Sequence, residues 1–192
     1  MSRLDEAKII KIFQQSFGKK SKFVPEDVEV LRIGKAYFVT KSDMLVESTD
    51  VPTGMKVDEI ARKSMVACIS DFSAKGVKPL YATVSLAIPR GFSQSKIKKL
   101  ASGFMKTSRE FGVKIIGGDT NEGKEIVIEV SMFGIAQKIT SRKGAKIGDV
   151  IITSGPFGYT SSGLKIILNH CKADPRFAKK SKKQVFMPIP RL

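Results

Sequence analysis

Four aspartates stand where the expected helices and strands begin or end: Asp27, Asp43, Asp71 and Asp119. The chain of 192 residues has a single histidine, His170, and two cysteines, neither of them in a CxxC pair. The composition therefore largely excludes metal sites rich in histidine or cysteine, and proton relays built on histidine, within these 192 residues. Carboxylates are the hard oxygen ligands that magnesium prefers, and this ion typically shares one or two of them with substrate phosphates. The acids therefore suit a magnesium site.

Asp71 belongs to a row of small and acidic residues on a helix expected at about 57–75. The row is Ser64, Ala67, Asp71 and Ala74, spaced i, i+3, i+7 and i+10 beside an apolar face. Small side chains let another group approach the backbone closely, and a carboxylate beside a buried face needs a hydrogen bond, an ion pair or a metal. A salt bridge, or a cap for a neighbouring loop, is the structural alternative for Asp71.

Asp119 follows Gly117 and Gly118 at the expected end of an apolar strand, where glycine permits a ligand to approach the backbone. An ordinary turn with an Asx hydrogen bond is the alternative. The chain contains neither a Walker A sequence nor GxGxxG for conventional phosphate binding. The segment from Gly155 to Gly158 precedes an expected helix, so it could bind an anion at the helix N-terminus or form a simple turn.

The elements that must position these residues alternate between strand and helix patterns. Apolar spacing and turn residues predict the order β-β-α-β-α-β-β after an N-terminal helix, which is an α+β fold. The expected helices cover about 4–17, 57–75 and 94–111, and the expected strands about 28–33, 36–41, 80–88, 113–116 and 125–137. A new segment then opens with a strand at 149–155 and a helix through 164–168. We expect one domain over 1–138 and the incomplete beginning of a second over 139–192.

The formal net charge of +16 invites an anionic partner. Residues 139–192 carry eleven basic and two acidic residues, whereas residues 1–138 carry twenty-three and sixteen. The lysine run at 179–183 is typical of a solvated face, and no KH clamp or RRM aromatic signature accompanies it, so we do not expect a nucleic-acid partner. No apolar run approaches the ~20 residues of a membrane span, and we expect a cytoplasmic protein without a membrane partner.

Four sequence motifs resemble the thiamine-monophosphate kinase family in their order and spacing. They are DMLVE at 43–47, SDFSAKGVKPLYATVSLAIPR at 70–90, IIGGDTN at 115–121 and RKGAKIGDVIITSGPFGYTSSGLKIIL at 142–168. The likeness is to an archaeal member and runs from about residue 24 to the end. The family belongs to the superfamily of aminoimidazole ribonucleotide synthetase. The resemblance implies a PurM-like N-terminal domain that binds Mg-ATP, carries helices on one face of its sheet and dimerises through that sheet.

The resemblance also implies an activity and roles for individual residues. The reaction is the phosphorylation of thiamine monophosphate by ATP, giving thiamine diphosphate. The residues that match the family's magnesium-binding positions are Asp27, Ser42, Asp43 and Asp71. Gly118 and Asp119 match a nucleotide-binding pair, and Arg142 matches an arginine that contacts ATP. Asp50 stands where bacterial members often have a substrate-contacting histidine, which makes it a substrate-binding position.

Two stretches depart from the family pattern. Pro25-Glu26-Asp27 replaces the common Gly-Asp-Asp before the first strand, and Lys41 replaces the common Ser or Thr before Ser42. The second change removes a hydroxyl from the metal neighbourhood. Family members also continue well beyond the Pro-Ile-Pro-Arg stretch at 188–191, so we expect most of the second domain to be absent and this chain to have little activity by itself.

Phosphoryl transfer suits carboxylates without histidine, because metals and cations neutralise charge while donor and acceptor are held in line. The acceptor is a phosphate monoester that is already deprotonated near neutral pH, so we assign no general base. The expected cofactor is Mg²⁺, with ATP as co-substrate and a second copy of the chain as partner. Two alternatives stay open: another ATP-dependent synthetase of the superfamily, and a basic module that binds RNA or other anions.

Overall fold

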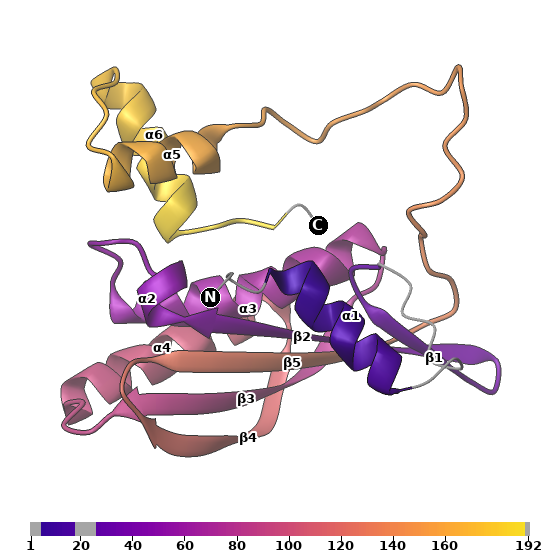
Figure 1. The fold of residues 1–192 in the computed structure, drawn as a ribbon, viewed down its shortest axis with the longest axis horizontal. Coiled ribbons are helices and arrows are strands. Elements are labelled where there is room, and N and C mark those ends of the chain that lie inside the picture. Colours follow the sequence, from indigo (N-terminus) through magenta and orange to yellow (C-terminus); the bar gives the residue numbers. More distant parts are fainter. Residues whose placement is uncertain (1–4, 18–25, 191–192) are drawn as a thin grey trace.

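The computed structural model describes residues 5–17 and 26–190 (Figure 1). Its helices are α1 (Glu6–Ser16), α2 (Glu47–Asp50), α3 (Val57–Ala74), α4 (Gln94–Phe111), α5 (Tyr159–Leu168) and α6 (Pro175–Phe186). Its strands are β1 (Glu29–Ile33), β2 (Ala36–Val46), β3 (Pro79–Pro89), β4 (Lys114–Gly123) and β5 (Val127–Ala136). The helices predicted at 57–75 and 94–111 are confirmed. Pro25, which belongs to the first departure from the family pattern, lies outside the described residues.

Five strands form one mixed sheet in the order β1-β2-β5-β3-β4. β3 and β4 are parallel, and the other neighbouring strands are antiparallel. Helix α4 supplies the crossover that a parallel pair requires. Gly112 ends α4 in the left-handed conformation with φ 66°, so the chain turns back toward β4. The predicted α+β fold class is confirmed.

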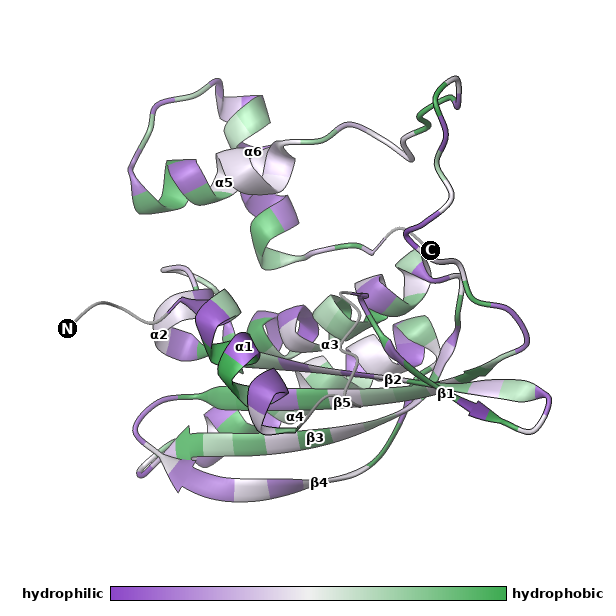
Figure 2. Ribbon diagram, turned by 45° about the vertical axis from the view of Figure 1, so that its right-hand side comes forward, coloured by the Kyte–Doolittle hydropathy of each residue, from purple (hydrophilic) through white to green (hydrophobic). Residues whose placement is uncertain are grey.

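Helices α3 and α4 cover one face of the sheet, which we call the helix-side face (Figures 1 and 2). Alternate strand residues point into the core beneath these helices, including Val39, Leu45, Ile128, Val130 and Met132. Helix α3 adds the larger, fully buried side chains of Met65, Cys68, Ile69 and Phe72. Burial of a large apolar side chain stabilises a fold by about 1.5–3 kcal/mol. The contact between α3 and the sheet is therefore a main source of stability.

The other face of the sheet, which we call the open face, carries exposed apolar side chains. The strand register places on it Leu31, Ile33, Met44, Tyr81 and Ile135. Phe38 and Phe133 lie on the same face and stack with their ring centroids 6.0 Å apart. An apolar surface of this kind is typical of a protein interface.

Two aspartates predicted at strand ends lie inside strands instead. Asp43 is within β2, which continues to Val46. The predicted turn at 117–120, which includes Asp119, is within β4, which continues to Gly123. Pairing of β4 with β3 uses backbone groups, so an edge strand can form from a polar sequence that resembles a turn. Both carboxylates therefore project from faces of the sheet.

The strand predicted at 149–155 is wrong. The structure has neither helix nor strand from 137 to 158, and Val150, Ile151 and Ile152 are 83%, 92% and 87% exposed. A strand needs a neighbouring strand to satisfy its backbone groups, and none of the described strands pairs with this segment.

The helix predicted through 164–168 is confirmed by α5, which packs against α6. Helix α6 was not predicted, because exposed lysines surround its two buried residues, Ser181 and Val185, and leave no clear apolar pattern in the sequence. The lysines at 179, 180, 182 and 183 are exposed, as predicted for a solvated face. After α6, the carbonyl oxygen of Pro188 accepts a hydrogen bond of 3.2 Å from Nε of Arg62 on α3, which ties this segment to the helical layer (Figure 1).

Gly103 fixes the distance between α3 and α4. A Cβ atom at Gly103 would lie 2.4 Å from the carbonyl oxygen of Asp58 and 2.9 Å from Cβ of Ala61. We predict that Gly103→Ala destabilises the fold by about 1–3 kcal/mol in urea unfolding, because the two helices must separate. Gly117→Ala is the control, since nothing lies within 4 Å of its added Cβ atom. Equal unfolding free energies for the two variants would contradict the prediction.

Candidate functional site

Asp43 and Asp71 meet at the contact between β2 and α3. Lys41 and Asp43 are two residues apart on β2, so both project toward the helix-side face. From α3, Asp71 forms an ion pair with Lys41, with Nζ and Oδ2 3.0 Å apart. The Lys41 and Asp71 side chains are 26% and 28% exposed, which places the pair at the rim of the core. The structure thus brings two predicted magnesium ligands together.

The charges of this cluster act on one another. Burial raises the pKa of Asp43, Lys41 opposes the rise, and the Asp71 carboxylate adds to it. For Lys41, burial alone would lower the pKa, but the hydrogen bond and charge of Asp71 outweigh burial and raise it. Two neighbouring carboxylates repel each other, and a nearby cation relieves this repulsion. Lys41 supplies that cation in this chain.

Cys68 lies three residues before Asp71 on the same helix and is not available as a nucleophile. Its thiol donates a hydrogen bond of 3.1 Å to the carbonyl oxygen of Val130. Burial raises the pKa of Cys68 to about 12. A nucleophilic cysteine requires a thiolate, so Cys68 has a structural role.

A second charged cluster joins the residues before β1 to the segment after β5. Nε of Arg142 donates to Oδ2 of Asp27 at 3.2 Å, and Nζ of Lys75 lies 3.1 Å from the same oxygen. Lys75 also pairs with Glu26, and its side chain is only 2% exposed. The hydrogen bond from Arg142 holds the pKa of Asp27 below its usual range. The charge of Asp71 also acts on Arg142, so the two clusters are neighbours.

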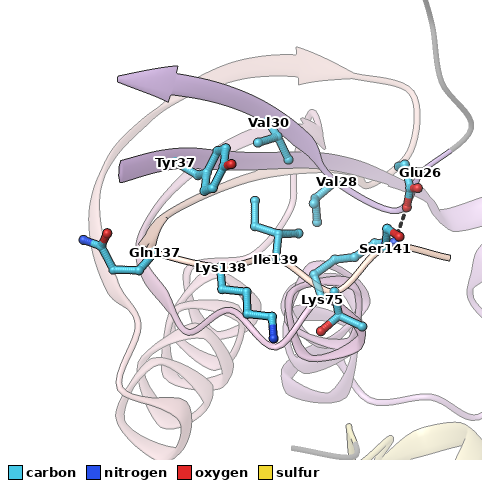
Figure 3. A pocket seen from close by; sticks show the side chains of 10 residues that line it. Glu26, Val28, Val30, Tyr37, Lys75, Gln137, Lys138, Ile139 and Ser141 are labelled. Carbon is cyan, nitrogen blue, oxygen red and sulfur yellow. Dashed lines mark hydrogen bonds and ion pairs between the residues drawn. The ribbon is translucent and has the colours of Figure 1, made fainter. Parts of the chain in front are cut away.

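A cavity of about 380 Å³ opens beside this second cluster (Figure 3). Its apolar wall consists of Val28, Val30, Tyr37 and Ile139, and the Glu26–Lys75 ion pair lies at one end. The segment 137–141 closes the cavity on the side of the helices. A cavity of this size is in the range that small-molecule sites occupy.

A smaller pocket of about 130 Å³ lies between β2 and α3. It is lined by Asp43, Met44, Leu45, Asp50, Lys63, Ser64 and Ala67. Asp43, predicted to bind metal, and Asp50, predicted to bind substrate, therefore share one pocket. Ser64 and Ala67 line the pocket with small side chains, which lets another group approach the helix backbone, as expected from the row of small residues on this helix.

Ser42 and Asp119 lie on the open face. The hydroxyl of Ser42 is 2.5 Å from that of Ser131, and Oδ1 of Asp119 accepts a hydrogen bond from the backbone N–H of Thr120. Asp119 is on β4, where the register pairs it with Ser85 of β3, and β4 lies three strands away from β2. That separation is about 14 Å at the usual strand spacing. Within one chain, Asp119 therefore does not join Asp43, and Ser42 can reach the Asp43 site only through its backbone.

Gly118 has a structural requirement of its own. It lies on the helix-side face in the same row as Val84, Val130 and Asp43. A Cβ atom at Gly118 would lie 1.8 Å from the carbonyl oxygen of Val84, so only glycine fits there. The close approach of β4 to β3 explains this glycine whether or not a nucleotide contacts it.

Three lysines of the site were not predicted from the sequence. From the sequence, Lys41 indicated only the loss of a hydroxyl group. Its spacing of two residues from Asp43 could have predicted that both side chains lie on the same face of the strand. Lys63 and Lys75 lie on or just after α3, but their partners are Asp50, Glu26 and Asp27, which are remote in sequence. Sequence spacing therefore could not identify these contacts.

Loss of the Arg142 guanidinium should remove the main cause of the lowered pKa of Asp27. We predict that Arg142→Met raises the pKa of Asp27 toward its ordinary range, as measured by NMR titration of the carboxyl carbon. Arg90→Met, which removes the exposed partner of Glu122, is the control and should leave Asp27 unchanged. An unchanged Asp27 pKa in Arg142→Met would contradict the assigned cause.

The same shift predicts how stability depends on pH. A carboxylate whose pKa is lower in the folded state stabilises the fold above its unfolded pKa, and this contribution is lost as the pH falls through the folded pKa. The wild type should therefore exceed Asp27→Asn in unfolding free energy near neutral pH, and this difference should disappear in acid. Denaturant unfolding at several pH values measures this difference in unfolding free energy. A difference that grows toward low pH would contradict the prediction.

Comparison with known sequences identifies relatives over the whole chain. The chain is 50% identical over 192 residues to the thiamine-monophosphate kinase of Nitrosopumilus maritimus, and 32% identical over 182 residues to that of Pyrococcus horikoshii. These matches cover 100% and 95% of this chain but 61% and 58% of the two relatives. The chain therefore spans about 60% of the length of these curated relatives.

Comparison with solved structures identifies the same fold. A structure described as "AaThiL complexed with AMPPCP and TMP" has a TM-score of 0.88 over 100% of this chain and 62% of that chain, at 22% identity. Thiamine monophosphate kinase from Aquifex aeolicus has a TM-score of 0.85 over 97% and 62%, also at 22% identity. Residues 25–136 match the family described as "AIR synthase related protein, N-terminal domain". The chain belongs to the family of AIR synthase related proteins and has the PurM-like fold of their N-terminal domain.

Proposed function

We propose that this chain forms the ATP-binding part of a thiamine-monophosphate kinase, which transfers the γ-phosphoryl group of ATP to thiamine monophosphate. The products are ADP and thiamine diphosphate. The observation that carries the proposal is the meeting of Asp43 and Asp71 in a chain that is 50% identical to a protein of that name. A protein of the same fold has been described in complex with AMPPCP and TMP, which supports the choice of substrates.

Asp43 and Asp71 fit a magnesium ion. Within residues 5–17 and 26–190, no group of three or more histidine, cysteine, aspartate or glutamate side chains is arranged to hold a metal ion. Magnesium commonly uses one or two carboxylates and completes its shell with water and phosphate oxygens, so two aspartates are a suitable set. We propose Asp27 and the backbone of Ser42 as further ligands. When bound, the ion would neutralise charge on the phosphates.

Other residues of the chain would bind and orient the nucleotide. A guanidinium matches phosphate oxygens with two parallel hydrogen bonds, and Arg142 is exposed enough to exchange Asp27 for a phosphate. Gly118 and Asp119 remain our proposed nucleotide-binding pair. The acceptor phosphate is already an anion near neutral pH, so the chain needs no general base.

We assign Mg-ATP binding and dimerisation to residues 1–138, and residues 139–192 to the beginning of a second domain. No helix in the described ranges is long and apolar enough to cross a bilayer. We place the protein in the cytoplasm, where Cys68 and Cys171 would remain reduced.

We further propose that two copies of the chain pack through their open faces. The exposed side chains of Leu31, Met44 and Ile135 would be buried by that contact. Ser42 and Asp119 lie on the same face, so both would approach the interface. This arrangement would give those two residues a role that a single copy does not.

Removal of one carboxylate should weaken nucleotide binding. We predict that Asp71→Asn lowers the affinity for Mg-ATP at least tenfold, about 1.4 kcal/mol, because a metal ligand is lost while the helix keeps its shape. Isothermal titration calorimetry with and without Mg²⁺ measures this effect. Asp149→Asn, an exposed aspartate outside the cluster, is the control. Unchanged Mg-ATP affinity in Asp71→Asn would show that the site is wrongly placed, and tight RNA binding without Mg²⁺ would favour the basic-module alternative.

A charge on the open face should prevent dimerisation. We predict that the wild type is a dimer by light scattering and that Ile135→Lys is a folded monomer, because a lysine would be desolvated at the interface. Ile147→Lys, at a fully exposed residue outside the sheet, is the control and should remain dimeric. A monomeric wild type at micromolar concentration would contradict the proposal.

A further inference from the structure

Lys63 is a half-buried cation on α3 that faces the pocket of about 130 Å³. Its Nζ atom donates a hydrogen bond to the backbone carbonyl of Asp50. In the described ranges of the chain it forms no ion pair with a carboxylate. An ammonium group has three N–H donors, so the carbonyl of Asp50 leaves donors available to a ligand.

The carboxylate of Asp50 does not neutralise this ammonium group directly. Its Oδ2 atom accepts hydrogen bonds from the backbone N–H of Val46 at 2.8 Å and from the hydroxyl of Thr49 at 3.1 Å. Asp50 therefore closes its own short helix, α2, and offers Lys63 only a backbone oxygen. Burial lowers the pKa of Lys63, and the charge of Asp50 offsets this only in part.

The other two lysines of the site are neutralised by acids. Lys41 pairs with Asp71, and Lys75 pairs with both Glu26 and Asp27. A cation that is partly removed from water without an acidic partner is costly, and a bound anion removes that cost. Of these three lysines, Lys63 is thus the one whose ammonium group can bind an anionic ligand.

We propose that Lys63 binds the phosphate group of a phosphate monoester in this pocket. The inference rests on the proposed function for the identity of that monoester, the acceptor thiamine monophosphate. Asp43 lines the same pocket, so one phosphate there would face both the ammonium of Lys63 and the carboxylate proposed to hold magnesium. Anions held between a metal and a lysine are a common arrangement in phosphoryl transfer.

The pocket is suited to a single phosphate group. Sites for whole ligands typically measure about 300–1,000 Å³, and this pocket has only about 130 Å³. Arg142 and Gly118, the residues assigned to ATP, do not line it. The pocket therefore takes the acceptor phosphate, with the rest of the acceptor outside.

The experiment compares ligands that differ by a phosphate group. Calorimetry on the full chain with Mg²⁺ would measure affinities for thiamine monophosphate, thiamine, inorganic phosphate and ATP. Lys63→Met should lower the affinities for thiamine monophosphate and inorganic phosphate at least tenfold and leave the affinities for thiamine and ATP unchanged. Lys63→Arg should restore part of the lost affinity. Lys99→Met, an exposed lysine on α4, is the matched control. If Lys63→Met does not fold, Lys63→Gln replaces it, since glutamine still donates to the carbonyl of Asp50.

The outcomes separate this inference from the proposed function. An equal loss for thiamine and its monophosphate would indicate a structural role and overturn the inference. If the wild type binds Mg-ATP, but Lys63→Met does not change the affinities for thiamine monophosphate and inorganic phosphate, the inference is overturned and the proposed function stands. Phosphate binding that depends on Lys63, without any affinity for thiamine monophosphate, would support the inference and overturn the proposed acceptor. A wild type that binds no phosphate ligand would overturn the inference.

Discussion

The close packing of α3 between the sheet and α4 is the constraint on which the site depends. On the sheet side, a Cβ atom at Gly134 would lie 2.8 Å from the Phe72 ring, and on the α4 side Gly103 permits a similar approach. The buried face of α3 is therefore fixed in both directions. Residues on its flank, among them Lys63 and Asp71, are fixed with it against β2. Their positions follow from the packing of the core and need no contribution from a ligand.

The ion pairs around α3 differ in how easily they can be exchanged. Lys75 is 2% exposed, and loss of its partners would leave a buried charge without compensation. Its pairs with Glu26 and Asp27 therefore hold the chain before β1 in place. Lys41 is 26% exposed, so water can replace Asp71 at modest cost. Asp71 can consequently turn to a metal without leaving a buried charge unpaired. Asp27 can exchange its contact with the exposed Arg142 while it keeps its contact with the buried Lys75.

The sequence predicted the elements whose apolar residues face the core. The spacing around Met65 and Phe72 predicted α3, and Gly112 predicted the end of α4. The errors occurred where backbone pairing or remote contacts decide the structure. The polar run around Asp119 forms a strand because β3 supplies backbone partners, and the apolar run at 149–155 forms none because no described strand pairs with it. Ion pairs between residues 30 or more positions apart, such as Lys41 with Asp71, depend on the fold and could not be predicted from spacing.

Two of the family-like motifs, Ser42-Asp43 and Gly118-Asp119, place adjacent residues within strands. Successive residues of a strand point to opposite faces, so each motif presents one member to the helix-side face and one to the open face. Asp43 and Gly118 share a row on the first face, and Ser42 and Asp119 lie on the second. Neither pair can therefore direct both of its side chains to the same face of the sheet in a single chain. A ligand that uses both members of a motif must contact the backbone, or reach around the sheet edge, or lie where another copy covers the open face. The sheet geometry thus limits which of the motif residues can act together.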